Sequence, residues 1–177
     1  MARLEIIMGG MFSGKSTEMI RRLKRHRSIG DKILVINSGK DVRNDKDVLQ
    51  THDRDTFECI KTNNLLYMLA REEYKKAKVV AVDETQFFAN LREFVEQALS
   101  DDKYVILAGL DGDFKQQVFG ELLLMIPLAD EVTKLRAFCG LCRDGTPGPF
   151  SKRTVSDLAQ ELVGDCNMYQ PVCRKHL

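Results

Sequence analysis

The sequence Gly-Gly-Met-Phe-Ser-Gly-Lys-Ser-Thr occupies residues 9–17, between an apolar run at 4–8 and an amphipathic segment at 16–29. It fits the pattern G-x-x-x-x-G-K-[ST], in which glycines let successive backbone N–H groups surround phosphate oxygens. A strand is expected before this loop and a helix after it, and the N-terminus of that helix adds partial positive charge at the loop. A glycine-rich turn capped by a serine is the alternative, but it does not account for the lysine.

We therefore predict a phosphate-binding loop for a nucleoside triphosphate. The lysine can reach the outer phosphates, and the serine after it can bind Mg²⁺. The predicted loop residues are Gly9, Gly10, Met11, Phe12, Ser13, Gly14, Lys15, Ser16 and Thr17.

Apolar strands alternate with helical segments through most of the chain. Strands without polar alternation, separated by helices, indicate a parallel sheet covered on both faces, so we predict an α/β fold. The expected strands are 4–8, 32–37, 79–82 and 104–108, and the expected helices are 16–29, 62–76 and 91–99.

The remaining segments have a different character. Residues 38–55 are polar and charged, and we expect a long loop there. From residue 138 the chain is rich in Gly, Pro and Cys, so we expect a nucleotide-binding domain at 1–137 and a small domain at 138–177.

Composition limits the possible partners. The 177 residues carry a formal net charge of +1, which argues against binding nucleic acid or a membrane by bulk electrostatic attraction. The basic run at 21–27 fits the solvated face of a helix better than a nucleic-acid site. The longest apolar run, 122–129, contains Pro127 and is too short to cross a bilayer. We expect a cytoplasmic protein.

Two acids, Asp83 and Glu84, follow the apolar run at 79–82. Ligands of open α/β sheets lie beyond the carboxyl ends of the strands, so both acids should face the phosphate loop. Asp83 fits the metal side, and Glu84 fits a general base. An ordinary pair of strand-end acids is the alternative. The motif does not decide between water and a bound hydroxyl as the group that Glu84 activates, and therefore between an NTPase and a kinase.

Four of the five cysteines lie in the last forty residues. Cys139 and Cys142, with Cys173 and His176, form C-x₂-C and C-x₂-H pairs, which are typical of tetrahedral Zn²⁺. Four protein ligands leave no open position, so we predict a structural zinc site. Two unrelated cysteine pairs are the alternative, and Cys166 has the wrong spacing to replace the histidine.

Taken together, several segments resemble cellular-type (type II) thymidine kinase. The likeness runs in consistent order from about residue 5 to residue 176. It is carried by residues 9–17, 83–88, 110–114 and 168–174 and by the two metal-ligand pairs, and residues 51–55 and 150–153 are also similar. Gly10 departs from the family, where proline is frequent, and so does His176, where cysteine is commoner.

The resemblance implies a RecA-like P-loop fold and transfer of the γ-phosphate of ATP to the 5′-hydroxyl of thymidine. The product would be dTMP in pyrimidine deoxynucleotide salvage, with Mg²⁺ required and Glu84 as the base. Family members are typically homotetramers that dTTP inhibits. The resemblance adds Asp41, Val42, Arg43, Asp83 and Gln86 to the loop residues that bind ATP and Mg²⁺.

For the nucleoside, the resemblance implies stacking of the base against Phe114. It also implies a zinc-ribbon and lasso-like substrate domain, in which a loop tethered by zinc closes over the base. The implied substrate residues are Met11, Phe87, Leu110, Phe114, Ser151, Arg153, Gln160, Glu161, Leu162, Val163, Gly164 and Tyr169.

Two other functions remain as alternatives. One is a P-loop ATPase with a structural zinc site, coupled to a protein or nucleic-acid partner. The other is a zinc-ribbon module that binds nucleic acid and keeps a vestigial nucleotide site. The near-neutral charge and the lack of aromatic residues interleaved with basic ones argue against the second.

Overall fold

The structure is a computed structural model, and it describes residues 1–41, 48–50, 56–157, 159–162 and 167–177. Its centre is a six-stranded sheet in which every pairing is parallel. In spatial order the strands are β5 (Ile60–Thr62), β2 (Ile33–Ser38), β6 (Val79–Val82), β7 (Tyr104–Gly109), β1 (Arg3–Gly9) and β8 (Glu131–Leu135). The predicted α/β class is confirmed.

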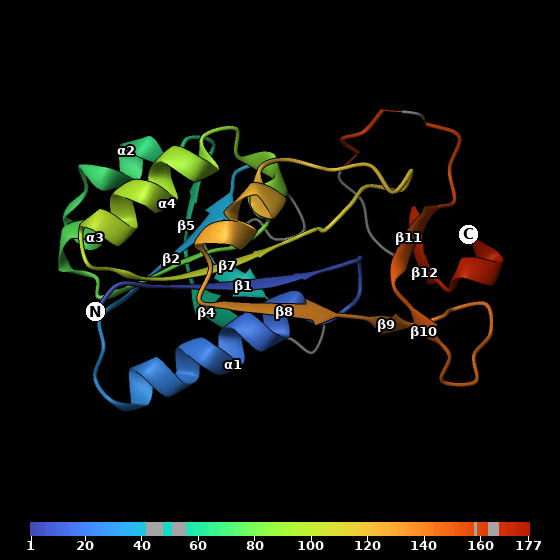
Figure 1. Cartoon of the computed structure of the whole chain (residues 1–177), viewed down its shortest axis with the longest axis horizontal. Helices are drawn as coiled ribbons and strands as arrows, with labels where there is room; N and C mark the ends of the chain where they lie inside the picture. The colour runs from blue at the N-terminus through green and yellow to red at the C-terminus, as the bar shows by residue number, and fades with distance from the viewer. Residues whose placement is uncertain (42–47, 51–55, 158, 163–166) are drawn as a thin grey trace.

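Both faces of the sheet are covered, as Figure 1 shows. Alternate strand residues point to opposite faces, so Ile6 and Ile7 belong to two separate apolar clusters. The cluster of Ile6 packs against α2 (Leu66–Leu69), α3 (Glu72–Lys76), α4 (Leu91–Ser100) and the 3₁₀ segment η2 (Leu122–Leu128). The cluster of Ile7 packs against α1 (Lys15–Ser28) and the hairpin of β3 (Val48–Gln50) and β4 (Thr56–Glu58).

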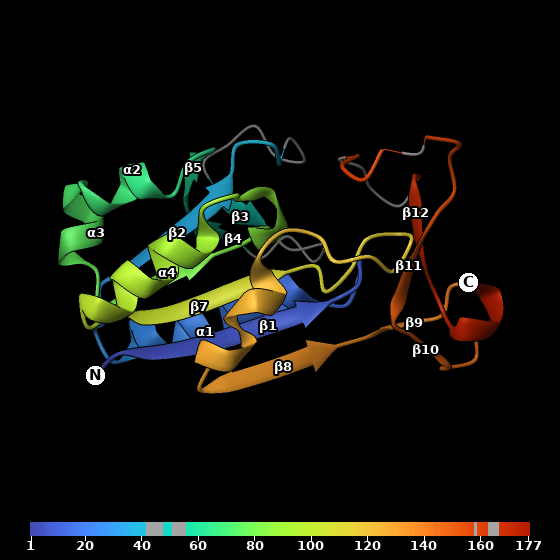
Figure 2. The same ribbon diagram turned by 45° about the horizontal axis from the view of Figure 1, so that its top comes forward.

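The C-terminal part of the chain lies beyond the carboxyl ends of the central strands. In Figure 2 the arrowheads of β1 and β8 point toward it. It contains β9 (Ala137–Phe138), β10 (Pro147–Gly148), β11 (Phe150–Arg153), β12 (Tyr169–Val172) and the 3₁₀ turn η3 (Arg174–His176). Strand β9 pairs antiparallel with β10, and β11 with β12. Because ligands of parallel sheets bind at these strand ends, the C-terminal part faces the predicted nucleotide site.

Three local predictions differ from the structure. The helix expected at 62–76 is two short helices, because Thr62 ends β5 and the Asn64 side chain accepts the backbone N–H of Leu66 at the start of α2. The loop expected at 38–55 contains strand β3, whose Leu49 packs into the cluster of Ile7. Strand β8 was not predicted, since residues 131–135 alternate between half-buried and exposed positions at the sheet edge.

The described helices include none that is long and apolar enough to cross a bilayer.

Candidate active site

The phosphate loop connects the end of β1 to the start of α1, as the sequence predicts. Gly9 and Gly14 have φ angles of 155° and 85°, which residues with a side chain rarely adopt. A Cβ at Gly9 would lie 2.4 Å from the backbone oxygen of Leu135 on the neighbouring strand, so only glycine fits there. The loop is therefore held in a conformation that depends on its glycines.

Polar groups of the loop converge on its centre. The Lys15 Nζ and the Ser13 hydroxyl each donate to the Gly10 oxygen at 2.8 Å. The lysine ammonium therefore lies over the loop, where the backbone N–H groups of a phosphate-binding loop gather.

The acid pair after β6 reaches this loop through a serine. Asp83, only 1% exposed, accepts a hydrogen bond from the Ser16 hydroxyl at 2.8 Å and another from the Glu84 N–H at 2.9 Å. A hydroxyl and a carboxylate side by side are oxygen ligands of the kind that Mg²⁺ prefers. The donor set at Ser16 and Asp83 therefore fits a magnesium ion held against bound phosphates.

Glu84 adopts a left-handed backbone conformation, with φ 52° and ψ 42°, which is strained for a residue with a side chain. The buried Gln86 holds its carboxylate: Nε2 donates to Glu84 Oε2 at 2.5 Å, and Oε1 accepts the N–H of Leu110 at 3.1 Å. Gln86 thus connects the acid to the end of β7. Each acid therefore has its own partner: Gln86 binds the Glu84 carboxylate, and Ser16 binds the Asp83 carboxylate.

Aromatic residues follow the ends of the neighbouring strands. Phe114 comes after β7, and the Arg153 guanidinium from β11 lies 3.8 Å from its ring centroid. Phe87 packs edge to face against Phe119, with 5.8 Å between their centroids, and the Lys40 ammonium lies 5.8 Å from the Phe87 ring. Half-buried aromatic rings therefore follow both the segment of Glu84 and the end of β7.

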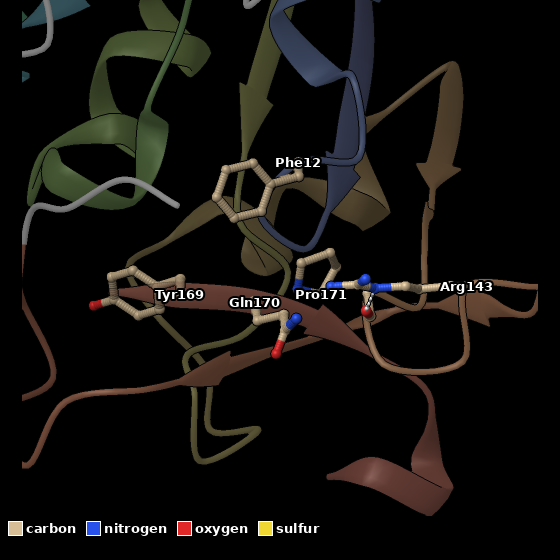
Figure 3. A pocket seen from close by; sticks show the side chains of 6 residues that line it. Phe12, Arg143, Tyr169, Gln170 and Pro171 are labelled. Carbon is tan, nitrogen blue, oxygen red and sulfur yellow. Dashed lines mark hydrogen bonds between the residues drawn. The ribbon is translucent and has the colours of Figure 1, made fainter. Parts of the chain in front are cut away.

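The phosphate loop also contacts the C-terminal part of the chain directly. The Met11 N–H donates to the buried Ser151 hydroxyl of β11 at 2.9 Å. A pocket of about 360 Å³ lies beside this contact, shown in Figure 3. Phe12 enters it from the loop and Tyr169, Gln170 and Pro171 from β12, and Gly140 and Arg143 complete its lining.

The predicted zinc ligands lie together at the far end of the molecule. The Cys142 and Cys173 sulfurs are 3.7 Å apart, and all three sulfurs lie 3.4–3.5 Å from the His176 Nδ1. Bonds of about 2.3 Å to sulfur and 2.0 Å to nitrogen around a tetrahedral ion give spacings of about 3.8 Å and 3.5 Å. The four ligand atoms therefore fit Zn²⁺ without rearrangement.

One of these thiols is also electrostatically prepared for a metal. Burial raises the pKa of Cys139, but backbone N–H groups of Cys142 and Cys173 outweigh it, and the pKa falls to about 5. Burial and the neighbouring thiols Cys139 and Cys173 raise the pKa of Cys142 to about 11, so the negative charge of the metal-free cluster lies mainly on Cys139. A thiolate is the form that binds zinc.

Comparisons with known proteins agree with this arrangement. A family profile described as "Thymidine kinase" matches residues 2–177. The chain belongs to the thymidine kinase family. Thymidine kinase a of Arabidopsis thaliana is 44% identical over 98% of this chain and 74% of its own length. A thymidine kinase of Variola virus is 40% identical over 97% of this chain and 94% of its own.

A thymidine kinase of Oryza sativa subsp. japonica is 40% identical over 98% of this chain and 65% of its own length. Among solved structures, the crystal structure of a DNA replication initiation factor aligns with 75% of this chain and 40% of that chain, at 12% identity and a TM-score of 0.47. That similarity is too weak to add to the thymidine kinase assignment.

Some of the predicted site residues lie outside the part of the chain that the structure describes. Val42, Arg43, Val163 and Gly164 lie outside the described residues. Asp41 is buried after β2, accepts a hydrogen bond from Asn37 and offers its backbone oxygen to Lys61.

Three residues that border the site, Lys40, Asp113 and Phe119, were not predicted as site residues. Lys40 forms an ion pair with Glu161 at 2.8 Å. Asp113 is buried and accepts the amide of Gln160, and Phe119 packs on Phe87. Asp113 is adjacent to Phe114 in a glycine turn, and that position could have drawn attention to it.

Proposed function

We propose that this chain is an ATP:thymidine 5′-phosphotransferase, which transfers the γ-phosphate of ATP to the 5′-hydroxyl of thymidine and forms dTMP. The observation that carries the proposal is the position of Glu84. Its carboxylate follows the Ser16–Asp83 pair on one side and is held by Gln86, whose other end binds Leu110 at the start of the aromatic surface. An acid between a phosphate site and a nucleoside-sized apolar surface suits transfer to a bound hydroxyl.

On the ATP side, the loop N–H groups and the Lys15 ammonium bind the phosphates. Ser16 and Asp83 would hold Mg²⁺, which would supply positive charge beside the phosphoryl group during transfer. Phosphoryl transfer needs little covalent chemistry from the protein, so positioning and electrostatic stabilisation carry most of the catalysis. Asp41, Val42 and Arg43 complete the predicted ATP side.

On the nucleoside side, Glu84 accepts the proton of the 5′-hydroxyl as the hydroxyl oxygen attacks the γ-phosphorus of ATP. The bond from the γ-phosphorus to the oxygen of the β-phosphate breaks, and ADP leaves. The thymine base stacks on Phe114. Met11, Phe87, Leu110 and Tyr169 enclose the nucleoside, together with Ser151 and the loop of Gln160, Glu161, Leu162, Val163 and Gly164. An enclosed site excludes water, which favours transfer over hydrolysis.

Zinc has a structural role in this proposal. Cys139, Cys142, Cys173 and His176 hold Zn²⁺ and fix the two ends of the segment between the first and second ligand pairs. Residues 1–137 form the nucleotide-binding domain and residues 138–177 the substrate domain.

The resemblance to the family extends the proposal to regulation and assembly. We propose a homotetramer that dTTP inhibits as an end product of the pathway. We also propose a cytoplasmic location, because a reducing compartment keeps zinc-binding thiols available.

The test is transfer of labelled γ-phosphate to a panel of nucleosides, with ATP and Mg²⁺. We expect thymidine to be phosphorylated. Glu84→Gln should bind ATP normally and lose about 100-fold or more in kcat, because general base catalysis contributes about 10²–10⁴-fold. Glu93→Gln, the same change at an exposed position of α4, is the matched control and should retain full activity. ATP hydrolysis at the same rate with and without nucleoside would instead support a P-loop ATPase.

A further inference from the structure

Arg153 is one of the few charged residues that the structure buries. It lies at the end of β11 and is 9% exposed. Burial of a cation is costly unless its donors are satisfied. Its hydrogen bonds therefore indicate what the residue does.

All five N–H donors of this guanidinium have a protein acceptor. Nε and Nη2 each donate one hydrogen bond to the Tyr169 hydroxyl, at 3.1 and 2.6 Å. Nη1 donates to the backbone oxygens of Asp157 at 2.9 Å and Ala159 at 2.5 Å. Nη2 donates its second hydrogen bond to the backbone oxygen of Gln160 at 3.2 Å. An arginine side chain has five donors, so none remains for a phosphate or a base.

Tyr169 extends the same network. Its hydroxyl accepts from Arg153 and donates to the backbone oxygen of Leu162 at 2.8 Å. Together the two side chains bind four carbonyl oxygens between residues 157 and 162. The described residues of this stretch belong to no helix or strand, so these side chains provide hydrogen bonds that regular structure provides elsewhere.

The same guanidinium also covers an aromatic ring. It lies 3.8 Å from the centroid of Phe114 and 5.1 Å from that of Tyr169. A planar guanidinium stacks on a ring face and at the same time presents its donors along its edge. One side chain therefore fixes the Phe114 ring and the 157–162 backbone relative to each other.

We propose that Arg153 is a positioning residue for the nucleoside, which acts through Phe114 and the backbone of residues 157–162 and makes no contact with substrate. This inference rests on the proposed function, because the nucleoside is placed against Phe114 and the 160–164 loop. It differs from the expectation for the basic segment at 151–153, in which Arg153 contacts the substrate. Lysine cannot replace arginine here, since an ammonium has three donors and no planar face.

The test compares Arg153→Gln and Arg153→Lys with Arg174→Gln. Arg174 is the matched control, because its guanidinium also stacks on a phenylalanine, Phe150, at 4.7 Å. No hydrogen bond from Arg174 to the described part of 157–162 is seen. Zinc content and far-UV circular dichroism establish that each variant is folded.

We expect both Arg153 variants to raise the thymidine KM about tenfold or more, because small displacements of positioning groups are costly. The ATP KM should change by less than about twofold, and Arg174→Gln should change neither. A folded Arg153→Gln variant with an unchanged thymidine KM, or equal rises in both KM values, would overturn the proposal.

Amide hydrogen exchange tests the structural step without any substrate. In Arg153→Gln, exchange of the Ala159 amide, which donates to the Asp157 side chain at 2.8 Å, should accelerate about tenfold or more, because the backbone oxygens of Asp157 and Ala159 lose the charged donor that holds this turn. Unchanged exchange there would also overturn the proposal. If the wild type phosphorylates no nucleoside, the proposed function fails, while the exchange experiment still decides whether Arg153 orders this segment. If Arg153→Gln does not fold, Tyr169→Phe takes its place, because it removes the bond to Leu162 and the hydroxyl that accepts two of the five Arg153 hydrogen bonds.

Discussion

Removal of zinc is expected to unfold the C-terminal part of the chain before the parallel sheet. Among the described residues of this part, the apolar cluster buries Cys139, Val172 and Cys173, and Cys142 and Phe150 pack against them. A fully buried large side chain stabilises by about 1.5–3 kcal/mol, so this cluster provides only on the order of 5 kcal/mol.

The opposing cost is much larger. The lost backbone entropy of this segment opposes folding, and the short β9–β10 and β11–β12 ladders offset it only in part. Structural zinc sites contribute about 10–16 kcal/mol. The metal is therefore expected to be the largest single stabilising contribution in residues 138–177.

The assay is amide hydrogen exchange with and without a chelator, with zinc content measured in parallel. We expect amides of β11 and β12 to lose protection at chelator concentrations that leave β1, β6 and β7 protected. Cys173→Ser should reproduce this pattern, while Cys59→Ala, at a buried cysteine outside the cluster, should leave zinc content unchanged. Unchanged protection of β11 and β12 in zinc-free protein would refute the reasoning, and so would simultaneous loss in the sheet.

Two further predictions concern stability. Gly9→Ala should destabilise the fold by on the order of 3 kcal/mol in urea unfolding, because its Cβ would meet the Leu135 oxygen at 2.4 Å. Gly14→Ala, with open space around the new Cβ, should destabilise the fold by about 1 kcal/mol. Equal losses of stability in the two variants would contradict this. The Arg21 and Arg22 guanidinium groups lower the pKa of Glu18 to about 2 from an ordinary 4.5, although burial opposes them. Glu18 therefore stabilises the fold fully above about pH 5, by on the order of 2 kcal/mol, and this contribution is lost as the pH falls through about 2. The difference in unfolding free energy between wild type and Glu18→Gln should follow that course, and a pH-independent difference would count against it.

The sequence predicted those parts of the fold for which local signals and tertiary packing agree. Strands β6 and β7 are continuous apolar runs that the sheet buries on both faces. Gly9 and Gly14 of the phosphate loop have positive φ, a conformation that glycine adopts without strain, although Phe12 in the same loop also has a φ of 62°. In both cases the residue type alone indicates the environment, burial for the strands and left-handed backbone for the glycines.

Prediction failed where tertiary contacts override a weak local pattern. Leu49 lies in a polar stretch, yet it forms part of a strand because the partner strand brings Phe57 into the same apolar cluster. In β8 the exposed positions break the apolar pattern, since this edge strand is buried on only one face. Neither contact can be inferred from nearby residues.

The candidate site shows the same limit at the level of single side chains. A lysine and an arginine in sequence at 152 and 153 both indicate a basic surface, but only the arginine turns inward. Lys152 is exposed and donates to the His176 backbone oxygen, while Arg153 spends its five donors on Tyr169 and three carbonyl oxygens. The alternation of β11 sends successive side chains to opposite faces, and the sequence does not say which face meets Phe114. A residue that positions the nucleoside and one that contacts it therefore carry the same sequence signal, and their hydrogen-bond partners distinguish them.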